Sequence, residues 1–192
     1  MKRRLGSNRM RAMLGVLLTL LAAPAALATT LVRMDLEELT RIAAVVARAR
    51  CLETSSRWEN GHLWTMTTFE LAEIWKGEAP RTIMVRLVGG NDGHRTVLVE
   101  GVPRFFPGEE VVLFLEPLRT GEMTVTSWAQ GTFRIHRDLH TKEENVTQDT
   151  GGLGLFDPAT REYHTGGVRR MALEEFRGRV LRVAAEMGAR PR

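Results

Sequence analysis

The sequence has few of the features that would point directly to a fold or an activity. It contains one cysteine, Cys51, so the chain cannot form an internal disulfide. It has no G-x-S-x-G segment, which excludes the serine nucleophile elbow. Its longest uncharged apolar run, from Ala12 to about Leu21, is followed by Pro24 and is too short for a membrane span. These absences leave an uncrosslinked chain with no evident catalytic motif.

The apolar run instead forms the centre of an export signal. Basic residues precede it, and Ala26-Leu27-Ala28 follows it with small side chains at the two positions that a signal peptidase reads. The basic residues are Lys2, Arg3, Arg4, Arg9 and Arg11. The pattern predicts a signal peptide over residues 1–28 that is cleaved before Thr29. We therefore expect a periplasmic or secreted protein with no membrane span after cleavage.

Removal of the signal changes the charge. The full chain has 27 Lys and Arg against 23 Asp and Glu, and five of the basic residues but none of the acidic ones lie in residues 1–28. The remaining chain carries 22 basic and 23 acidic residues, a formal charge of about −1. Nucleic-acid binding needs a basic patch on the folded domain. The high isoelectric point of the full chain is therefore no argument for it, and we expect no nucleic-acid partner.

The chain from residue 29 onward has a length typical of one domain. Asp35 precedes an apolar helical pattern and Glu38 follows three residues later, which predicts a short capped helix over 36–43. From Ala44 the apolar period becomes two, with Cys51 on the inward face and arginines such as Arg48 on the solvent face. We interpret Cys51 as a small buried side chain and not as a nucleophile.

The strongest turn signal is Asn60-Gly61, a favoured type I′ hairpin pair. The returning strand, 63–75, has apolar residues of both parities, which suggests a bulge near Thr67-Thr68. Further strands are expected over 81–88, 96–100, 110–115, 123–128 and 131–137, and the unalternating apolar run 111–115 indicates a strand covered on both faces.

The last third of the chain is expected to be less regular. Residues 138–168 are polar and Gly-rich, and residues 169–192 have the apolar spacing of a helix that packs on the same domain. The sequence thus predicts a mainly β fold, a small OB-like closed or partly open β-barrel of six to eight strands over 29–137. A short N-terminal helix and a C-terminal helix complete it, and a sandwich is the alternative.

The candidate chemical groups are sparse. His136 and His140 are four residues apart, but the glutamate of an H-E-x-x-H zinc motif is missing. The glycine-rich loop 89–93 has no Lys-Ser/Thr after it, so it is not a phosphate loop. We therefore expect no metal and no cofactor, and no catalytic residue stands out.

The chain resembles a group of exported bacterial proteins for which no activity is established. The match covers about residues 31–137 and depends on these segments: Leu36-Glu37-Glu38-Leu39, Ile74-Trp75-Lys76-Gly77, Gly101-Val102-Pro103-Arg104-Phe105, Phe106 to Leu115 and Ala129-Gln130-Gly131-Thr132-Phe133. The order of these segments is similar, more distantly, to the OB-like barrel of netrin-like modules, which include the tissue inhibitors of metalloproteinases. The resemblance implies the fold. The inhibitor mechanism does not carry over, because it needs an N-terminal cysteine and this chain begins its mature part at Thr29.

The leading functional hypothesis is an exported non-enzymatic binding module, whose partner is another protein or a component of the cell envelope. Asn91, Asp92 and His94 form a candidate interaction loop. One alternative is a hydrolase whose site is assembled from dispersed residues such as Asp92, His94 and Glu100. A second alternative is a protease inhibitor that acts through the loop 89–94.

Overall fold

The computed structural model describes residues 30–189, which form two α-helices, one 3-10 helix and thirteen strands. The expected signal peptide, residues 1–28, and its cleavage residues Ala26, Ala28 and Thr29 lie outside the described residues. The elements, in chain order, are β1 (Thr30–Val32), α2 (Leu36–Ile42), β2 (Val45–Glu59), β3 (His62–Lys76), β4 (Thr82–Val88), β5 (Gly90–Asn91), β6 (Thr96–Val97), β7 (Glu110–Pro117), β8 (Met123–Val125), η1 (Trp128–Gly131), β9 (Thr132–Arg137), β10 (Glu144–Gln148), β11 (Gly154–Asp157), β12 (Glu162–Thr165), β13 (Met171–Ala172) and α3 (Leu173–Gly188).

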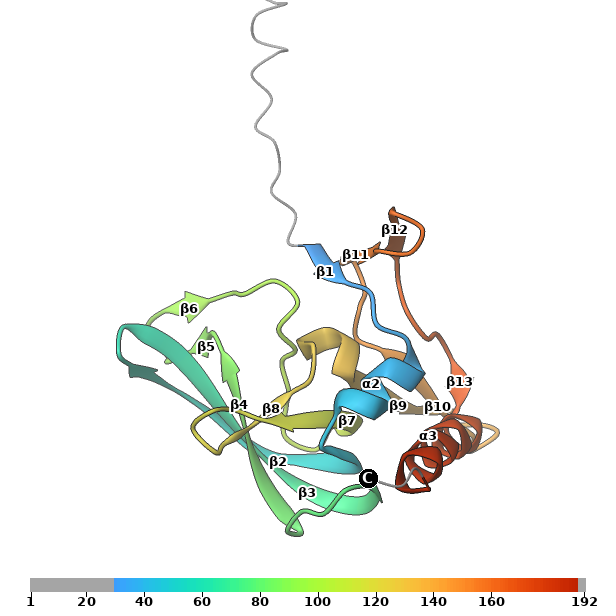
Figure 1. Cartoon of the computed structure of the whole chain (residues 1–192). Helices are drawn as coiled ribbons and strands as arrows, with labels where there is room; N and C mark the ends of the chain where they lie inside the picture. Colours follow the sequence, from blue (N-terminus) through green and yellow to red (C-terminus); the bar gives the residue numbers. More distant parts are fainter. Residues whose placement is uncertain (1–29, 190–192) are drawn as a thin grey trace, which may run out of the picture.

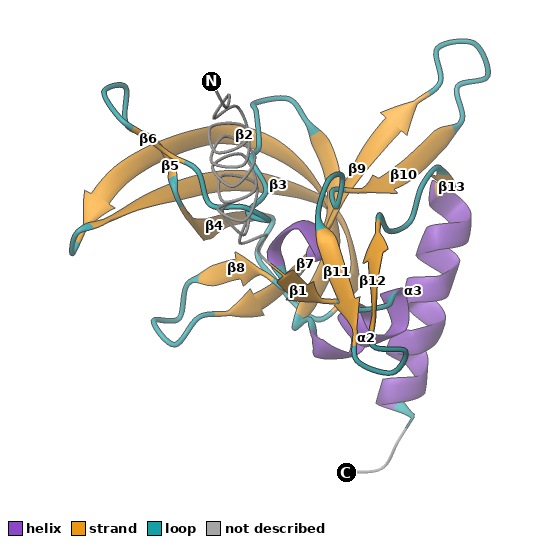
Figure 2. Ribbon diagram, turned by 90° about the horizontal axis from the view of Figure 1, so that it is seen from above, coloured by secondary structure: helices purple, strands orange, loops and turns teal. Residues whose placement is uncertain are grey.

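The β2–β3 hairpin is the longest feature of the fold and curves away from both helices (Figures 1 and 2). Its turn is the predicted one, with positive φ values of 50° at Asn60 and 79° at Gly61. The predicted bulge lies on the partner strand: Cys51 pairs with Phe69 and Glu53 with Thr68, so the extra residue is Leu52. The two parities in β3 have another cause, because side chains from both of its faces are buried.

One curled sheet contains eight strands in the order β13-β10-β9-β7-β2-β3-β4-β8, and β8 also pairs with β7. The mainly β fold with a large sheet and two helices is confirmed. The sheet does not close into a continuous barrel, because β8 is three residues long and meets β4 only at the pair Val85–Met123. Small sheets β1-β11-β12 and β5-β6 flank it.

The two faces of the large sheet bury two separate cores. The inner core lies within the curl, and the helix-side core lies between the sheet and the helices α2 and α3. Fourteen buried residues form the inner core: Val45, Ala47, Ala49, Cys51, Phe69, Leu71, Ile83, Val85, Leu87, Phe105, Val111, Leu113, Leu115 and Val125. Twelve form the helix-side core: Leu36, Leu39, Ala43, Val46, Trp75, Val112, Phe114, Phe133, Val146, Leu173, Phe176 and Val180. The alternation of β7 between these cores explains its unbroken apolar sequence, and burial on both faces is confirmed.

The face of β2 that carries Arg48 is less exposed to solvent than we predicted from its arginines. Arg48 donates to Glu144 at 2.9 Å and to Glu110, and only 18% of its side chain is exposed. The reason is the helix-side core, which covers this face at the start of β2 and leaves Arg48 at its border. The predicted burial of Cys51 is confirmed, with 1% of the residue exposed.

Helix α2 has the predicted N-terminal cap, and its C-terminal end is held by the end of β3. The Asp35 carboxylate caps α2 and accepts the Glu38 N–H at 2.7 Å, as predicted. At the other end of α2, the Lys76 Nζ donates to the carbonyl oxygens of Thr40, Arg41 and Ala43. The next residue, Gly77, has φ of 76°, and a Cβ there would overlap the Ala44 carbonyl oxygen. The Trp-Lys-Gly segment therefore joins α2 to the end of β3.

The segment 138–168 contains more structure than expected. It includes β10, β11 and β12, and β11 pairs in parallel with β1. These strands are held by two small sets of buried apolar side chains: Val146 lies in the helix-side core, and Leu155 packs with Leu153 and Ala129. The strands have four or five residues each, too few for a clear alternation, and β11 has a distant partner, β1, besides its hairpin partner β12.

A buried glutamine joins the N-terminal segment to the rest of the fold. Gln130 is fully buried, and its Oε1 accepts the Met34 N–H at 2.8 Å. Its Nε2 donates to the Val32 carbonyl and to the Ser127 hydroxyl, both at 2.8 Å. Two of these bonds hold backbone groups of the segment between β1 and α2, and the third holds Ser127 beside Gln130, so one side chain fixes the path of that segment.

Candidate functional site

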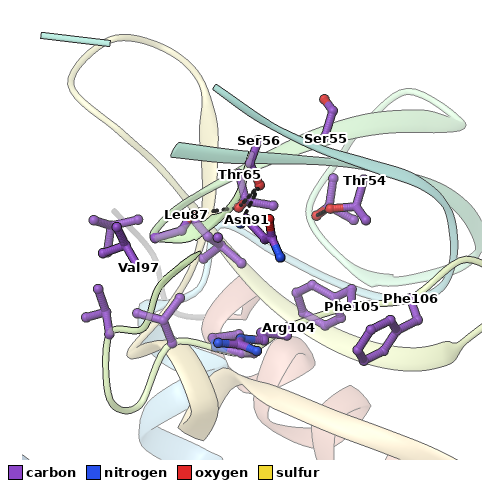
Figure 3. Close-up of a pocket in the computed structure, with 17 residues that line it drawn as sticks. Thr54, Ser55, Ser56, Thr65, Leu87, Asn91, Val97, Arg104, Phe105 and Phe106 are labelled. Carbon is purple, nitrogen blue, oxygen red and sulfur yellow. Dashed lines mark hydrogen bonds between the residues drawn. The ribbon is translucent and has the colours of Figure 1, made fainter. Parts of the chain in front are cut away.

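A groove of about 260 Å³ lies on the concave side of the β2–β3 hairpin, beyond the inner core. We call it the concave groove. Figure 3 shows Thr54, Ser56 and Thr65 on one side of it and Arg104, Phe105 and Phe106 on the other. The complete lining is Thr54, Ser55, Ser56, Thr65, Thr67, Leu87, Val88, Gly89, Gly90, Asn91, Val97, Val99, Val102, Pro103, Arg104, Phe105 and Phe106. One wall is thus rich in hydroxyls and the other is mainly apolar.

The hydroxyl wall depends on a close crossing of the chain over the hairpin. After β4, the chain turns at Gly89 and Gly90, which have φ values of 87° and 133°. A Cβ at Gly90 would overlap the hydroxyl oxygens of Thr65 and Ser56, so glycine is required for this approach. The crossing places Asn91 against Ser56 at the end of the groove.

The hydroxyls at this crossing form a chain of hydrogen bonds with a defined direction. Thr65 donates its single hydroxyl proton to the Gly89 carbonyl at 2.6 Å. Ser56 therefore donates to Thr65 across their 2.8 Å contact, and it accepts the Asn91 N–H at 3.2 Å. Thr54 and Thr67 pair at 3.3 Å deeper in the groove. These hydroxyls are held by one another, with no base beside them in the groove lining, so they present fixed polar groups to a ligand.

Among the described residues, 30–189, Arg104 is the only charged one that lines the groove. It belongs to an extended segment in which Phe105 points into the inner core and packs edge-on against Phe69, with ring centroids 5.0 Å apart. Alternation then turns Phe106 outward, and its exposed fraction is 61%. Arg104 is also exposed, and its side chain has no ion-pair partner among residues 30–189.

The segment around Arg104 is held firmly by its neighbours. The Arg104 carbonyl accepts a hydrogen bond of 2.8 Å from Arg134. The Arg134 guanidinium also pairs with Glu109 at 3.0 Å and Asp149 at 2.8 Å, which raises its pKa against the opposing effect of burial. Glu109 and Asp149 are thus paired with Arg134, and no ion pair joins either of them to Arg104, which lines the groove and also the neighbouring hollow that contains Glu100.

The candidate interaction loop is only partly in the groove. Asn91 lines it, whereas Asp92 holds the β5–β6 turn by accepting the N–H groups of His94 at 2.8 Å and Arg95 at 2.7 Å. Asp92 also accepts the Trp58 indole N–H at 2.6 Å, and these bonds lower the pKa of its carboxyl to about 2. The contact between Asp92 and His94 is thus made by the backbone of His94. Glu100 lines a different hollow beside Gly101 and Leu153, so the groove does not bring these residues together as a set.

A second hollow, of about 460 Å³, lies between β4 and the loop before β8. It is lined by apolar side chains, including Met66, Met84 and Met123. Its arginine, Arg86, is already paired with Glu122 at 2.9 Å and with Glu59 at 2.6 Å. The concave groove differs from it in combining the Arg104 guanidinium with a wall of fixed hydroxyls, and we regard it as the candidate binding site.

No protein-family model matches the chain, and no curated protein matches it. Within residues 30–189, no helix has the length and apolar character needed to cross a bilayer. In the same range, no three acidic, histidine or cysteine side chains are grouped so that they could hold a metal ion.

Sequence reasoning missed most of the groove. Arg104 and Phe106 were part of the segments that carry the resemblance, but no role followed from their types. The available signal was the Thr54-Ser55-Ser56 run, which faces Thr65 and Thr67 across the hairpin turn where apolar side chains would be expected.

Proposed function

We propose that the protein is an exported, non-enzymatic binding module that holds an amphipathic ligand in the concave groove. The observation that carries this proposal is the combination of an apolar wall, a wall of fixed hydroxyls and one unpaired guanidinium, Arg104. Binding sites of this kind are mainly apolar and use a few placed polar groups for orientation. The ligand is then a protein or envelope component with an apolar body and an anionic group.

We also propose that the curled part of the sheet is a partly open OB-like barrel. The pairings β2-β3, β3-β4, β4-β8, β8-β7 and β7-β2 link five strands into a ring, with β4 and β8 parallel. An OB-like barrel is the fold that the distant resemblance to netrin-like modules implies. Five-stranded barrels of this class commonly bind ligands on an open face.

Export is supported by the basic, apolar and small-residue pattern of residues 1–28. Expression of the full chain in a bacterium and intact-mass analysis of the exported product tests it. We expect a mature chain that begins at Thr29. Replacement of Ala26 and Ala28 by leucine should stop processing, whereas replacement of Ala22 and Ala23 should not. Accumulation of the unprocessed wild-type chain in the cytoplasm would contradict export.

Ligand binding is tested by affinity capture from a bacterial envelope extract separated into protein, glycan and lipid fractions. Arg104→Gln and Phe106→Ala remove the charge and the exposed ring of the groove, and we expect each to weaken capture by about tenfold or more. Arg119→Gln is the matched control, because Arg119 is also exposed but lies in the loop after β7, outside the groove. Capture that does not depend on Arg104 or Phe106 would contradict the proposal.

A further inference from the structure

The outer edge of β2 changes character along the strand. Its first half pairs with β7 from Val45 to Arg50, and the last bonds of that ladder join Cys51 to the chain at Glu109 and Gly108, at 2.9 and 2.8 Å. From Leu52 onward, β2 pairs with β3 alone within residues 30–189. The distal half of the strand therefore has an unpaired edge about seven residues long.

The hairpin turn fixes which backbone groups this edge presents. Asn60-Gly61 is a two-residue turn, so Glu59 and His62 form its hydrogen-bonded closing pair. Alternate residues of an antiparallel strand direct their N–H and C=O groups to opposite sides. Thr54, Ser56 and Trp58 therefore direct theirs to the free edge.

This edge has only part of the usual protection against pairing. Natural edge strands are commonly blocked by charged side chains, especially lysine, by proline or by a bulge. The bulge at Leu52 lies at the start of the free edge, and the segment 53–59 contains neither lysine nor proline. Its charged side chains are engaged within the hairpin: Arg57 is paired with Glu59, and Glu53 accepts a hydrogen bond from Thr68 at 3.3 Å. The distal edge is thus competent to accept another strand.

The free edge borders the concave groove. The side chains of Thr54 and Ser56 line the groove while their backbones face the edge. The turn at Pro107-Gly108 takes the chain off the edge, and the segment before it carries Arg104 and Phe106 on the opposite wall (Figure 3). A strand that continued the course of β7 along the edge would direct every second side chain into the groove.

We propose that the ligand of the concave groove is an extended polypeptide segment of another protein, which adds to the distal edge of β2 as a strand. An acidic side chain of this segment pairs with Arg104, and neighbouring inward side chains contact Phe106. This inference rests on the proposed binding function and specifies its ligand.

The charges of the groove favour a foreign segment over a second copy of the chain. Within the part of the chain that the structure describes, the groove lining contains a guanidinium and no carboxylate, so it complements an acidic side chain. In a symmetric pairing of two copies, the edge would bring Thr54, Ser56 and Trp58 to the partner's groove face, and none of them is acidic. Such a pairing would leave Arg104 without a partner.

Selection of a displayed library of random twelve-residue peptides on the purified chain tests the proposal. We expect the selected peptides to alternate apolar and polar residues, with aspartate or glutamate at an inward position. Hydrogen exchange of the complex should show protection at the amides of Thr54, Ser56 and Trp58. Methylation of single peptide nitrogens should lower affinity by about tenfold at every second position, where the nitrogen donates to β2. This peptide scan does not depend on the folding of any variant.

Variants of the chain separate the two contacts. Thr54→Pro removes an outward N–H and should weaken the peptides about tenfold, whereas Thr54→Ala keeps that N–H, loses only the side-chain hydroxyl of the groove wall, and should weaken them clearly less than Thr54→Pro does. Arg104→Gln should weaken only the acidic peptides, and Arg119→Gln should weaken none.

Three results with peptides would overturn the proposal: no peptide is selected, methylation weakens binding without an alternation between successive positions, or hydrogen exchange is slowed at amides other than those of Thr54, Ser56 and Trp58. A dimer that light scattering detects and that Thr54→Pro abolishes would also overturn it, because the edge would then pair with a second copy of the chain. Envelope capture that needs Arg104 and Phe106 while the peptides fail would overturn strand addition and leave the proposed function intact. Loss of that dependence would overturn the proposed function itself.

Discussion

Replacement of Gln130 by leucine should destabilise the fold far more than its change in size suggests. The two side chains have similar volume, so the packing of the site is largely kept. The substitution removes the three hydrogen bonds of the amide and leaves the Met34 N–H, the Val32 carbonyl and the Ser127 hydroxyl without these partners. Each buried polar group that loses its partner costs about 1–3 kcal/mol. Because water reaches some of these groups, we expect a total loss of about 3 kcal/mol.

Such a loss is a large fraction of the roughly 5–15 kcal/mol by which a domain of this kind is stable. It should lower Tm by about 6–12 °C. Urea unfolding followed by circular dichroism measures the free energy, and hydrogen exchange at the Met34 amide reports on the local contact. Ser127→Ala is the control, because it removes one bond and should cost about 1 kcal/mol or less. A Gln130→Leu variant within about 0.5 kcal/mol of the wild type, with an unchanged Met34 exchange rate, would refute this reasoning.

Three further predictions concern local chemistry. Gly77→Ala should lower the free energy of unfolding, measured in urea, by more than about 2 kcal/mol, because Gly77 has a positive φ and a Cβ there would overlap the Ala44 carbonyl. As a control, Gly178→Ala in α3 should raise that free energy by about 0.5–1 kcal/mol, because a Cβ at Gly178 meets no other atom. The hydrogen bond from Arg48 lowers the pKa of Glu144 in the folded chain, so this ion pair stabilises the fold above the unfolded pKa of about 4.3, and the stabilisation is lost as pH falls through the lower folded pKa. Glu144→Gln should therefore be less stable than wild type at pH 7 and equal to it near pH 2. A difference in stability that does not change with pH would contradict this. Burial, and to a lesser degree Glu109, raise the pKa of the Cys51 thiol, so an aromatic disulfide reagent at pH 8 should label Cys51 only as fast as the chain unfolds.

The elements that the sequence predicted correctly depend on short-range signals. The Asn60-Gly61 turn, the Asp35 cap and the unalternating strand β7 each follow from a few adjacent residues whose conformational preference or burial is strong. The C-terminal helix was also predicted, because Leu173, Phe176, Val180 and Val183 repeat at helical spacing and are buried.

The elements that were missed depend on distant partners. Strand β11 has four residues; besides its hairpin with β12 it pairs with β1, more than a hundred residues earlier in the chain, and no local pattern indicates that pairing. The incomplete closure of the sheet is set by the single pair between β4 and β8, which no local pattern encodes. The groove has the same origin: its two walls come from segments about fifty residues apart, and serine, threonine and phenylalanine have no motif that marks them as a site.

The extra residue at Leu52 explains why a single strand can serve both the core and the groove. Before it, odd-numbered side chains such as Ala49 and Cys51 point into the inner core. After it, even-numbered side chains point to the same concave face, which places Thr54 and Ser56 in the groove. Without the bulge, Glu53 and Arg57 would face inward beside Phe106, and their charges would need new partners there. The bulge coincides with the end of the β7 ladder, so the change of side-chain phase and the release of the edge occur at the same point. Both are required for a strand that adds to the edge and directs side chains into the groove.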